Sequence, residues 1–436
     1  MRPRSALVLA GSVLVLAGRA PVLAGRAPVL APRALARASC VWRPRRDPCI
    51  LLLMPRAPLA ALDRRRRCPG GVGPFGRRAS TSRRWWAPLA AVATLLWHPA
   101  TASALGAPSD REALLVLATE LESGKGPGGS AAVYARAFTG YSLVAEGLSD
   151  PGFAPAAASH VERLAAQVAR LETKFDTGVV TVAGRGLSSS AVLRGHLALL
   201  LVGRRALGGM SEKDLALEEA LVHGLAADVH ADRNHLLPSY GRRTWPADNE
   251  VVLAALRAHV ALAGHDEAIE PAAAELAASL TAITRGGLPA SEVEPDSLAR
   301  KDVPRGCALS WSVAFRGLHD PAAAEALWEV VRADYLVHVG PAVGVREWPP
   351  GVERKADADS GPIFRGVGAA ASAFALPATR LAAAPADHLA LRGSAQLAGL
   401  ATVEAKRGTE QLPRAIALWG RLARPLPASK AAAAPR

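Results

Sequence analysis

Apolar residues recur at helical spacing through most of the chain beyond residue 104. Between residues 321 and 338 they fall at positions i, i+3, i+4, i+7 and i+11, as Ala324, Leu327, Trp328, Val331 and Tyr335. A stripe of this kind is typical of a helix that buries one face. The same pattern predicts about twelve helices, over residues 110–123, 130–147, 157–175, 189–205, 211–228, 246–264, 268–284, 308–318, 321–338, 362–382, 388–404 and 412–423.

Capping residues mark the starts of several of these helices. Ser109 stands three residues before Glu112, which is the spacing of a capping box. Asp320 precedes Pro321 at a later start, where the missing N–H of proline costs nothing. Strand signals are scarce, and the best of them covers only residues 179–182. The chain is therefore expected to be all-α.

About twelve helices in consecutive antiparallel pairs favour an (α/α)6 barrel, a toroid of inner and outer helices, over residues 105–430. A solenoid of helix pairs is the rival architecture, but no repeat of 34 or 40 residues supports it. In a toroid, the loops at one end surround a central funnel. We therefore expect function in loops that are long and rich in aromatic and charged residues.

The first part of the chain differs in composition from the rest. Residues 1–104 contain 18 Arg, no Lys and two Asp, a net charge of +16, whereas the remainder carries −2. Residues 17–23 are repeated letter for letter at 24–30. Residues 1–81 are either a disordered basic leader or sequence upstream of the true start. Because the excess of arginine lies in this leader, the pI of about 10.4 does not indicate a nucleic-acid partner.

Residues 82–104 resemble a secretory signal. Two arginines precede an apolar run from Trp85 to Trp97, and small residues follow up to Ala104. The run is shorter than the roughly 20 residues of a membrane span. We expect a periplasmic or secreted protein. The alternative is that the signal segment stays uncleaved, in which case it would be the only contact with a membrane.

Cysteine usage fits a domain without internal disulfides. Three of the four cysteines lie in the leader, and only Cys307 lies in the expected domain. The core must therefore be stabilised by apolar burial, for which a domain of this length supplies enough Ala, Leu and Val.

The first of three unusual loops covers residues 237–249. It holds Tyr240, Trp245 and the Asp248–Asn249 pair, together with two arginines, which is more than a simple turn needs. Two interpretations of Asp248 remain open. Its carboxylate faces a pocket, or it only stabilises the first turn of the following helix.

The second loop covers residues 343–362. Its first aromatic and charged residues are Arg346, Glu347 and Trp348. Near its end, Asp357 and Asp359 are two residues apart, so in extended backbone both face one space. Close like charges raise one pKa, whereas the positive end of a helix from residue 362 favours the ionised forms. An acid and base pair and a set of solvated charges both remain open.

The third loop, residues 301–307, contains Arg305 and Cys307. A thiol near a helix N-terminus and an arginine ionises more readily, which would make Cys307 a nucleophile. The alternative is a small buried apolar group, the commoner role of a lone cysteine.

Neither a metal nor a cofactor is expected. Four acidic and histidine residues crowd together without the spacing of a zinc or calcium site, at Asp228, His230, Asp232 and His235. Residues 366–371 fit G-x-G-x-x-A, but we predict that they lie inside the helix 362–382, with no strand before them. His196 lies on an apolar helix and is most simply a hydrogen-bonded core histidine.

Over about residues 190–385 the chain resembles the linalool dehydratase/isomerase superfamily. The residues that carry the resemblance are Gly195-His196-Leu197, Leu237-Pro238-Ser239-Tyr240, Trp245-Pro246-Ala247-Asp248-Asn249, Arg346-Glu347-Trp348-Pro349 and Asp357-Ala358-Asp359-Ser360-Gly361-Pro362. The resemblance implies an exported α/α-barrel protein and a cofactor-free lyase or isomerase that acts on an alcohol or alkene in an apolar pocket. The family's site looks like an Asp, Tyr, His and paired-cysteine arrangement, of which only Cys307 supplies a cysteine here.

We therefore expect an exported acid/base enzyme of the lyase or isomerase type that uses no cofactor. The candidate catalytic residues are Asp248, Asp357, Asp359, Tyr240, His196 and Cys307. The candidate substrate-binding residues are Trp245, Asn249, Arg305, Arg346, Glu347 and Trp348, with Arg346 holding an oxyanion or hydroxyl. The rivals are a glycan-active enzyme with two carboxylates at the scissile bond, a non-catalytic protein that binds sugar or lipid on its aromatic rings, and a degenerate paralogue. The expected partner is a small molecule or glycan, and the chain is a candidate homo-oligomer.

Overall fold

The computed structural model describes residues 109–171, 175, 177–357, 359–402 and 411–427. The chain divides into two units, Met1–Ser80 and Thr81–Arg436, and all described residues belong to the second. The expected leader, 1–81, and the signal-like segment, 82–104, lie outside the described residues and stay predictions.

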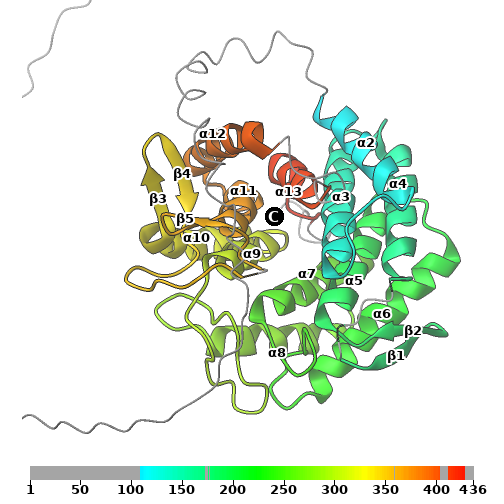
Figure 1. The fold of residues 1–436 in the computed structure, drawn as a ribbon. Coiled ribbons are helices and arrows are strands. Elements are labelled where there is room, and N and C mark those ends of the chain that lie inside the picture. The colour runs from blue at the N-terminus through cyan, green and yellow to red at the C-terminus, as the bar shows by residue number, and fades with distance from the viewer. Residues whose placement is uncertain (1–108, 172–174, 176, 358, 403–410, 428–436) are drawn as a thin grey trace, which may run out of the picture. The chain divides into compact units, whose positions relative to one another are not determined.

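Twelve helices, counted over the described residues, account for most of the fold (Figure 1). They are α2 (Asp110–Glu122), α3 (Ser130–Ser149), α4 (Ala154–Val168), α5 (Ala191–Ala206), α6 (Glu212–Ala231), α7 (Pro246–Ala263), α8 (Ile269–Ala282), α9 (Gly306–Gly317), α10 (Pro321–Tyr335), α11 (Ala369–Leu381), α12 (Pro385–Thr402) and α13 (Gln411–Leu422). The predicted all-α class is confirmed. Within this part of the chain, none of the helices combines the length and the apolar sequence that crossing a membrane requires.

The predicted capping residues stand at the helix starts. At α2 the Ser109 hydroxyl accepts from the Glu112 N–H over 3.2 Å, and the Glu112 carboxylate accepts from the Ser109 N–H over 2.7 Å. At α10 the Asp320 carboxylate accepts from the Ala323 N–H over 3.0 Å. These local bonds replace the partners that the first N–H groups of a helix lack.

In the described part of the chain, three antiparallel hairpins interrupt the helices, each forming a sheet of two strands. They join β1 (Val179–Val182) to β2 (Arg185–Ser188), β3 (Leu336–Val339) to β4 (Ala342–Val345), and β5 (Ile363–Phe364) to β6 (Val367–Gly368). Only β1 was predicted. The others are no longer than four residues, which is too short for an alternating pattern to stand out.

Two predicted helix boundaries are wrong because hairpins occupy the sequence. The helix expected over 321–338 ends at Tyr335, where β3 follows. The helix expected from residue 362 begins at Ala369, because Arg365 and Gly366, with φ of 51° and 81°, form the β5–β6 turn. The G-x-G-x-x-A residues therefore lie across a hairpin and a helix start, not inside a helix. A two-residue antiparallel hairpin is not the parallel strand and crossover of a dinucleotide fold.

Alternate helices pack against one another in succession. α3 contacts α5, α5 contacts α7, α7 contacts α9, α9 contacts α11, and α11 contacts α13, which in turn contacts α3. The remaining helices pack on these, as α4 does on α3 and α10 does on α9. Figure 1 shows the alternate helices lying inside the others within this unit.

Aromatic side chains meet where the alternate helices face one another. Phe138 of α3 stacks on Trp419 of α13 with ring centroids 5.0 Å apart, and Trp311 of α9 meets Phe374 of α11 edge-on at 4.8 Å. His196 of α5 lies 5.5 Å from Trp311. Each such pair adds about 0.5–1.5 kcal/mol beyond the apolar area that it buries. This aromatic cluster therefore fixes five helices relative to one another.

The start of α9 approaches the backbone of the second loop closely. The Gly306 N–H donates to the Glu347 carbonyl over 2.8 Å, and a Cβ built on Gly306 would lie 1.8 Å from the carbonyl oxygen of Arg346. Only glycine fits at this distance. The contact places Arg305 and Cys307, on either side of the glycine, beside the Glu347 side chain.

Replacing Gly306 by alanine is expected to lower the free energy of unfolding by about 3 kcal/mol, because a backbone clash cannot be relieved by rotating a side chain. Gly224 in α6 is the matched control, since nothing lies within 4 Å of a Cβ built there. Urea unfolding should show Gly224→Ala stabilised by up to about 1 kcal/mol, because alanine is the better helix former. Small and equal effects at the two positions would contradict the close approach.

Candidate functional site

The three loops expected to carry chemistry precede α7, α9 and α11, and backbone pairing joins them. Thr244 of the first loop pairs with Val293, which also pairs with Arg300 just ahead of the third. The third loop is joined to the second by the hydrogen bond between Gly306 and Glu347. Segments far apart in sequence therefore lie side by side.

Asp248 lies in the first turn of α7 and is only 4% exposed. Its carboxyl bonds with the Ser239 hydroxyl, and its Oδ2 has no partner among the described residues. Trp245 is the N-cap residue of α7 and makes no side-chain capping hydrogen bond, and Asp248 is the acidic residue of the first turn. Burial, together with the nearby charge of Asp359, raises the pKa of this carboxyl from 3.8 to about 7. A group with this pKa both donates and accepts protons near neutral pH.

Two tyrosine hydroxyls are hydrogen-bonded to each other beside Asp248. They belong to Tyr134 of α3 and to Tyr240 of the first loop. Burial, followed by the charge of Asp248, raises the pKa of both phenols above the ordinary value, so both stay protonated. Sequence reasoning missed Tyr134 because it lies on the buried face of its helix, where an aromatic residue indicates only core packing.

Asp357 is held in the ionised form. Partial burial raises the pKa of its carboxyl, but the N–H of Ser360 and the guanidinium of Arg305 outweigh that effect, and the pKa is lowered. The Arg305 bond is 2.9 Å long, and the backbone N–H groups of Asp359 and Ser360 donate to the same Oδ1. These bonds close a turn, so the extended backbone expected at this pair is wrong.

Asp359 has the opposite shift. It is exposed, and partial desolvation followed by the charge of Asp357 raises the pKa of its carboxyl. The helix expected to stabilise the ionised form begins only at Ala369, so it exerts no such effect at this position. The charge of Asp359 also acts on Asp248 and Tyr240, which places the end of the second loop near the buried acid.

A buried ion pair links the second and third loops. Arg305 Nε donates to Glu347 Oε1 over 2.9 Å, and the Cys307 thiol donates to the same oxygen over 3.0 Å. Glu347 is fully buried, and its Oε2 has no partner in the described part of the chain. Removing either Arg305 or Glu347 would leave the other charge buried without a partner, which is strongly destabilising. The pair therefore holds the second and third loops together.

The Cys307 thiol is not activated by its surroundings. Burial, followed by the charge of Glu347, raises its pKa well above the ordinary value, against the opposing charge of Arg305. The proximity of a helix N-terminus and an arginine predicts the opposite. These surroundings favour the second interpretation of Cys307, a small buried group.

A cavity of about 230 Å³ opens between the loops. Most of its lining residues are charged, namely Arg243, Glu292, Asp302, Arg305, Arg354, Lys355 and Asp357. The lining also includes Trp245, whose ring centroid lies 5.8 Å from that of Tyr240. Asp248 is not part of the lining, but Trp245 is the N-cap residue of α7, three residues before Asp248, so the cavity wall and the buried acid belong to the same helix start.

Trp348 has little free ring surface. The guanidinium carbons of Arg305 and Arg354 lie 4.9 and 5.1 Å from its ring centroid, and the side chain is buried. Cation–π contacts of this kind stabilise the loop. They also occupy the ring against which a sugar would stack.

Seven predicted site residues are not part of this lining, namely Asp248, Asp359, Tyr240, Glu347, Asn249, Arg346 and His196. The last three make contacts elsewhere. Asn249 is fully buried, and its amide bonds both the N–H and the carbonyl of Leu237, which closes the first loop. A guanidinium nitrogen of Arg346 lies 3.4 Å from the position of a Cβ on Gly366, in the β5–β6 turn. Nδ1 of His196 is hydrogen-bonded to the hydroxyl of Tyr141 over 2.7 Å. Burial lowers the pKa of this imidazole to about 3.

The cluster of acidic and histidine residues at the end of α6 and just beyond it makes ion-pair contacts. Asp228 pairs with Arg194, whereas His230 and His235 both approach Glu275. Over the residues that the structure describes, no three His, Cys, Asp or Glu side chains are grouped to hold a metal ion.

Comparison of the sequence with models of known protein families gives no match, and comparison with curated proteins gives none either. The assignment of a function therefore rests on the geometry of the site.

The raised pKa of Asp248 predicts a pH-dependent stability. Between pH of about 4 and 7 the native state keeps a proton that the unfolded chain has lost, so stability falls as pH rises through this window. Asp248→Asn removes this slope. In urea unfolding, the free energy of unfolding of the variant minus that of the wild type should rise by about 4 kcal/mol at most between pH 4 and pH 8. An equal difference at both pH values would show that Asp248 ionises normally in the fold.

Proposed function

We propose that this chain is a cofactor-independent acid/base enzyme of the lyase or isomerase type, with Asp248 as its central proton carrier. The observation that carries the proposal is a buried carboxyl with a pKa of about 7 and one unpartnered oxygen, next to two bonded phenols. A catalytic acid or base works best when its pKa lies near the operating pH. Groups with strongly perturbed pKa values mark functional sites more often than structural ones.

We further propose that the helices form an (α/α)6 toroid. The succession of contacts from α3 through the alternate helices to α13 and back to α3 supports this arrangement. The loops that precede α7, α9 and α11 would then lie at one end of a ring of inner helices. That placement agrees with the backbone bonds that join them.

In the proposed reaction, protonated Asp248 donates its proton to a hydroxyl or alkene carbon of the substrate. The carboxylate that results takes a proton from a neighbouring carbon, which completes an elimination or isomerisation without net change of the enzyme. Tyr240 and Tyr134 hold the substrate oxygen and relay protons, while Asp359 is the second carboxylate.

A glycan-active enzyme is the second candidate. The charged wall of the cavity favours it, because the family resemblance implies an apolar pocket and the lining here is rich in arginines and carboxylates. Charged and polar side chains suit a substrate with many hydroxyl groups. The non-catalytic interpretation is weaker, because Trp348 offers little free ring surface.

Membership of the linalool dehydratase/isomerase superfamily and export through residues 82–104 remain proposals. The motifs quoted above are their support. The mass of the mature N-terminus would test export directly, since cleavage after residue 104 removes the whole basic leader.

The proposal predicts proton exchange between solvent and substrate. The chain is incubated in D2O with a panel of allylic alcohols, alkenes and oligosaccharides. Hydroxyl deuterium is exchanged back in H2O, and the deuterium that stays bound to carbon is measured by mass spectrometry. Asp248→Asn should lower the rate of incorporation at least about 100-fold, as expected for loss of a general acid or base. Asp296→Asn, at an exposed carboxylate 80% accessible on a neighbouring loop, is the matched control and should leave the rate unchanged.

The pH profile gives a second readout of the same proposal. The rate of deuterium incorporation by the wild type should change with pH around an apparent pKa near 7. In Asp248→Asn this pH dependence should disappear. Incorporation that survives in Asp248→Asn with the same profile would remove Asp248 from the mechanism.

A further inference from the structure

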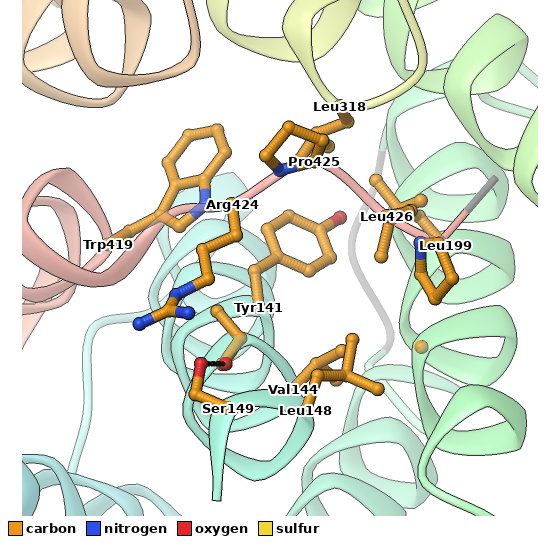
Figure 2. Close-up of a pocket in the computed structure, with 13 residues that line it drawn as sticks. Tyr141, Val144, Leu148, Ser149, Leu199, Leu318, Trp419, Arg424, Pro425 and Leu426 are labelled. Atoms are coloured by element: carbon orange, nitrogen blue, oxygen red, sulfur yellow. Dashed lines mark hydrogen bonds between the residues drawn. The ribbon is translucent and has the colours of Figure 1, made fainter.

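A second cavity, of about 280 Å³, lies away from the three loops (Figure 2). It is lined by the C-terminal half of α3, by α5 and by the segment that follows α13. Figure 2 shows Tyr141 and Trp419 on one side of it and Leu199 and Leu426 on the other. None of its lining residues takes part in the proposed acid/base chemistry.

The wall of this cavity is largely apolar, and two of its polar side chains, Tyr141 and Ser149, are already bonded. Val144, Leu148 and Leu318 add aliphatic surface to the residues just named. The Tyr141 hydroxyl is bonded to His196 over 2.7 Å, and the Ser149 hydroxyl donates to a carbonyl of its own helix over 2.6 Å. A ligand inside the cavity therefore finds few hydrogen-bond partners.

Arg424 supplies the one charged side chain of the lining. It is exposed and forms no ion pair with any residue that the structure describes. The positive charges of Arg424 and Arg392 both act on Arg380, whose Nε donates to the Ala423 carbonyl over 2.8 Å. Among the described residues of the lining there is no carboxylate, so the charge that the lining carries is positive.

We propose that this cavity binds a small amphiphile with one carboxylate head group, of the medium-chain fatty-acid class. The acyl chain lies among the aliphatic side chains, and the carboxylate pairs with Arg424 at the exposed side. The volume lies just below the roughly 300–1,000 Å³ of small-molecule pockets, which suits a medium chain and excludes a diacyl lipid. Arginine is the side chain best shaped to bind a carboxylate.

The probes are octanoate, octan-1-ol and octyltrimethylammonium, each titrated calorimetrically into the full chain below its aggregation concentration. The shared alkyl chain isolates the head group. Octanoate should bind about five times more tightly than the alcohol, the upper value for an exposed ion pair, and the cation should bind more weakly still. Acetate, which has the head group alone, should not bind measurably.

Two variants separate the head-group contact from the cavity. Arg424→Gln should make octanoate and octan-1-ol bind equally, while leaving the affinity for the alcohol unchanged. Ser149→Trp, at an exposed position of the rim, should weaken both ligands by blocking entry. Thermal melting of the apo proteins confirms that the variants are folded.

Three results would overturn the proposal. They are the absence of octanoate binding, equal binding of octanoate and octan-1-ol to the wild type, and octanoate binding that neither Arg424→Gln nor Ser149→Trp changes. Because the assay measures binding at the second cavity and not turnover, its failure leaves the acid/base proposal standing.

Discussion

The site depends on one constraint, the burial of the Asp248 carboxyl with an oxygen that no described residue satisfies. An ionised carboxylate in this position lacks both solvent and a cationic partner, so the proton is retained to about neutral pH. The two phenols beside it are also kept protonated by burial. The result is a group of protonated oxygens around a carboxyl that exchanges its proton near physiological pH.

The rest of the fold holds that carboxyl in place. Pro246 and the buried Asn249 fix the first turn of α7 and the loop before it, and the aromatic cluster below fixes the helices. Gly306 brings Arg305 and Glu347 together, so the charges of the second and third loops largely neutralise one another. Removing these supports would let water reach Asp248 and return its pKa to the ordinary range.

The sequence predicts those features of the fold that depend on neighbouring residues, such as helix starts and buried helix faces. The Ser109 capping box and the apolar stripe that contains Trp328 predicted helices correctly. The sequence also singled out the first loop, whose Asp248 and Tyr240 lie close together in the structure. The pairing of Tyr134 with Tyr240 joins residues 106 apart, so no local pattern reveals it. Arg346 was expected in the site, but alternation along the loop turns Glu347 inward and Arg346 toward the β5–β6 turn.

The most direct test of the account is the titration of Asp248 itself. Carbon-13 NMR of protein labelled at aspartate carboxyl carbons follows each side chain across pH, and Asp248→Asn assigns the signal. The account predicts that this carboxyl titrates near pH 7. A midpoint near pH 4, the ordinary value for aspartate, would contradict it, because Asp248 would then be fully ionised at neutral pH and unable to donate a proton.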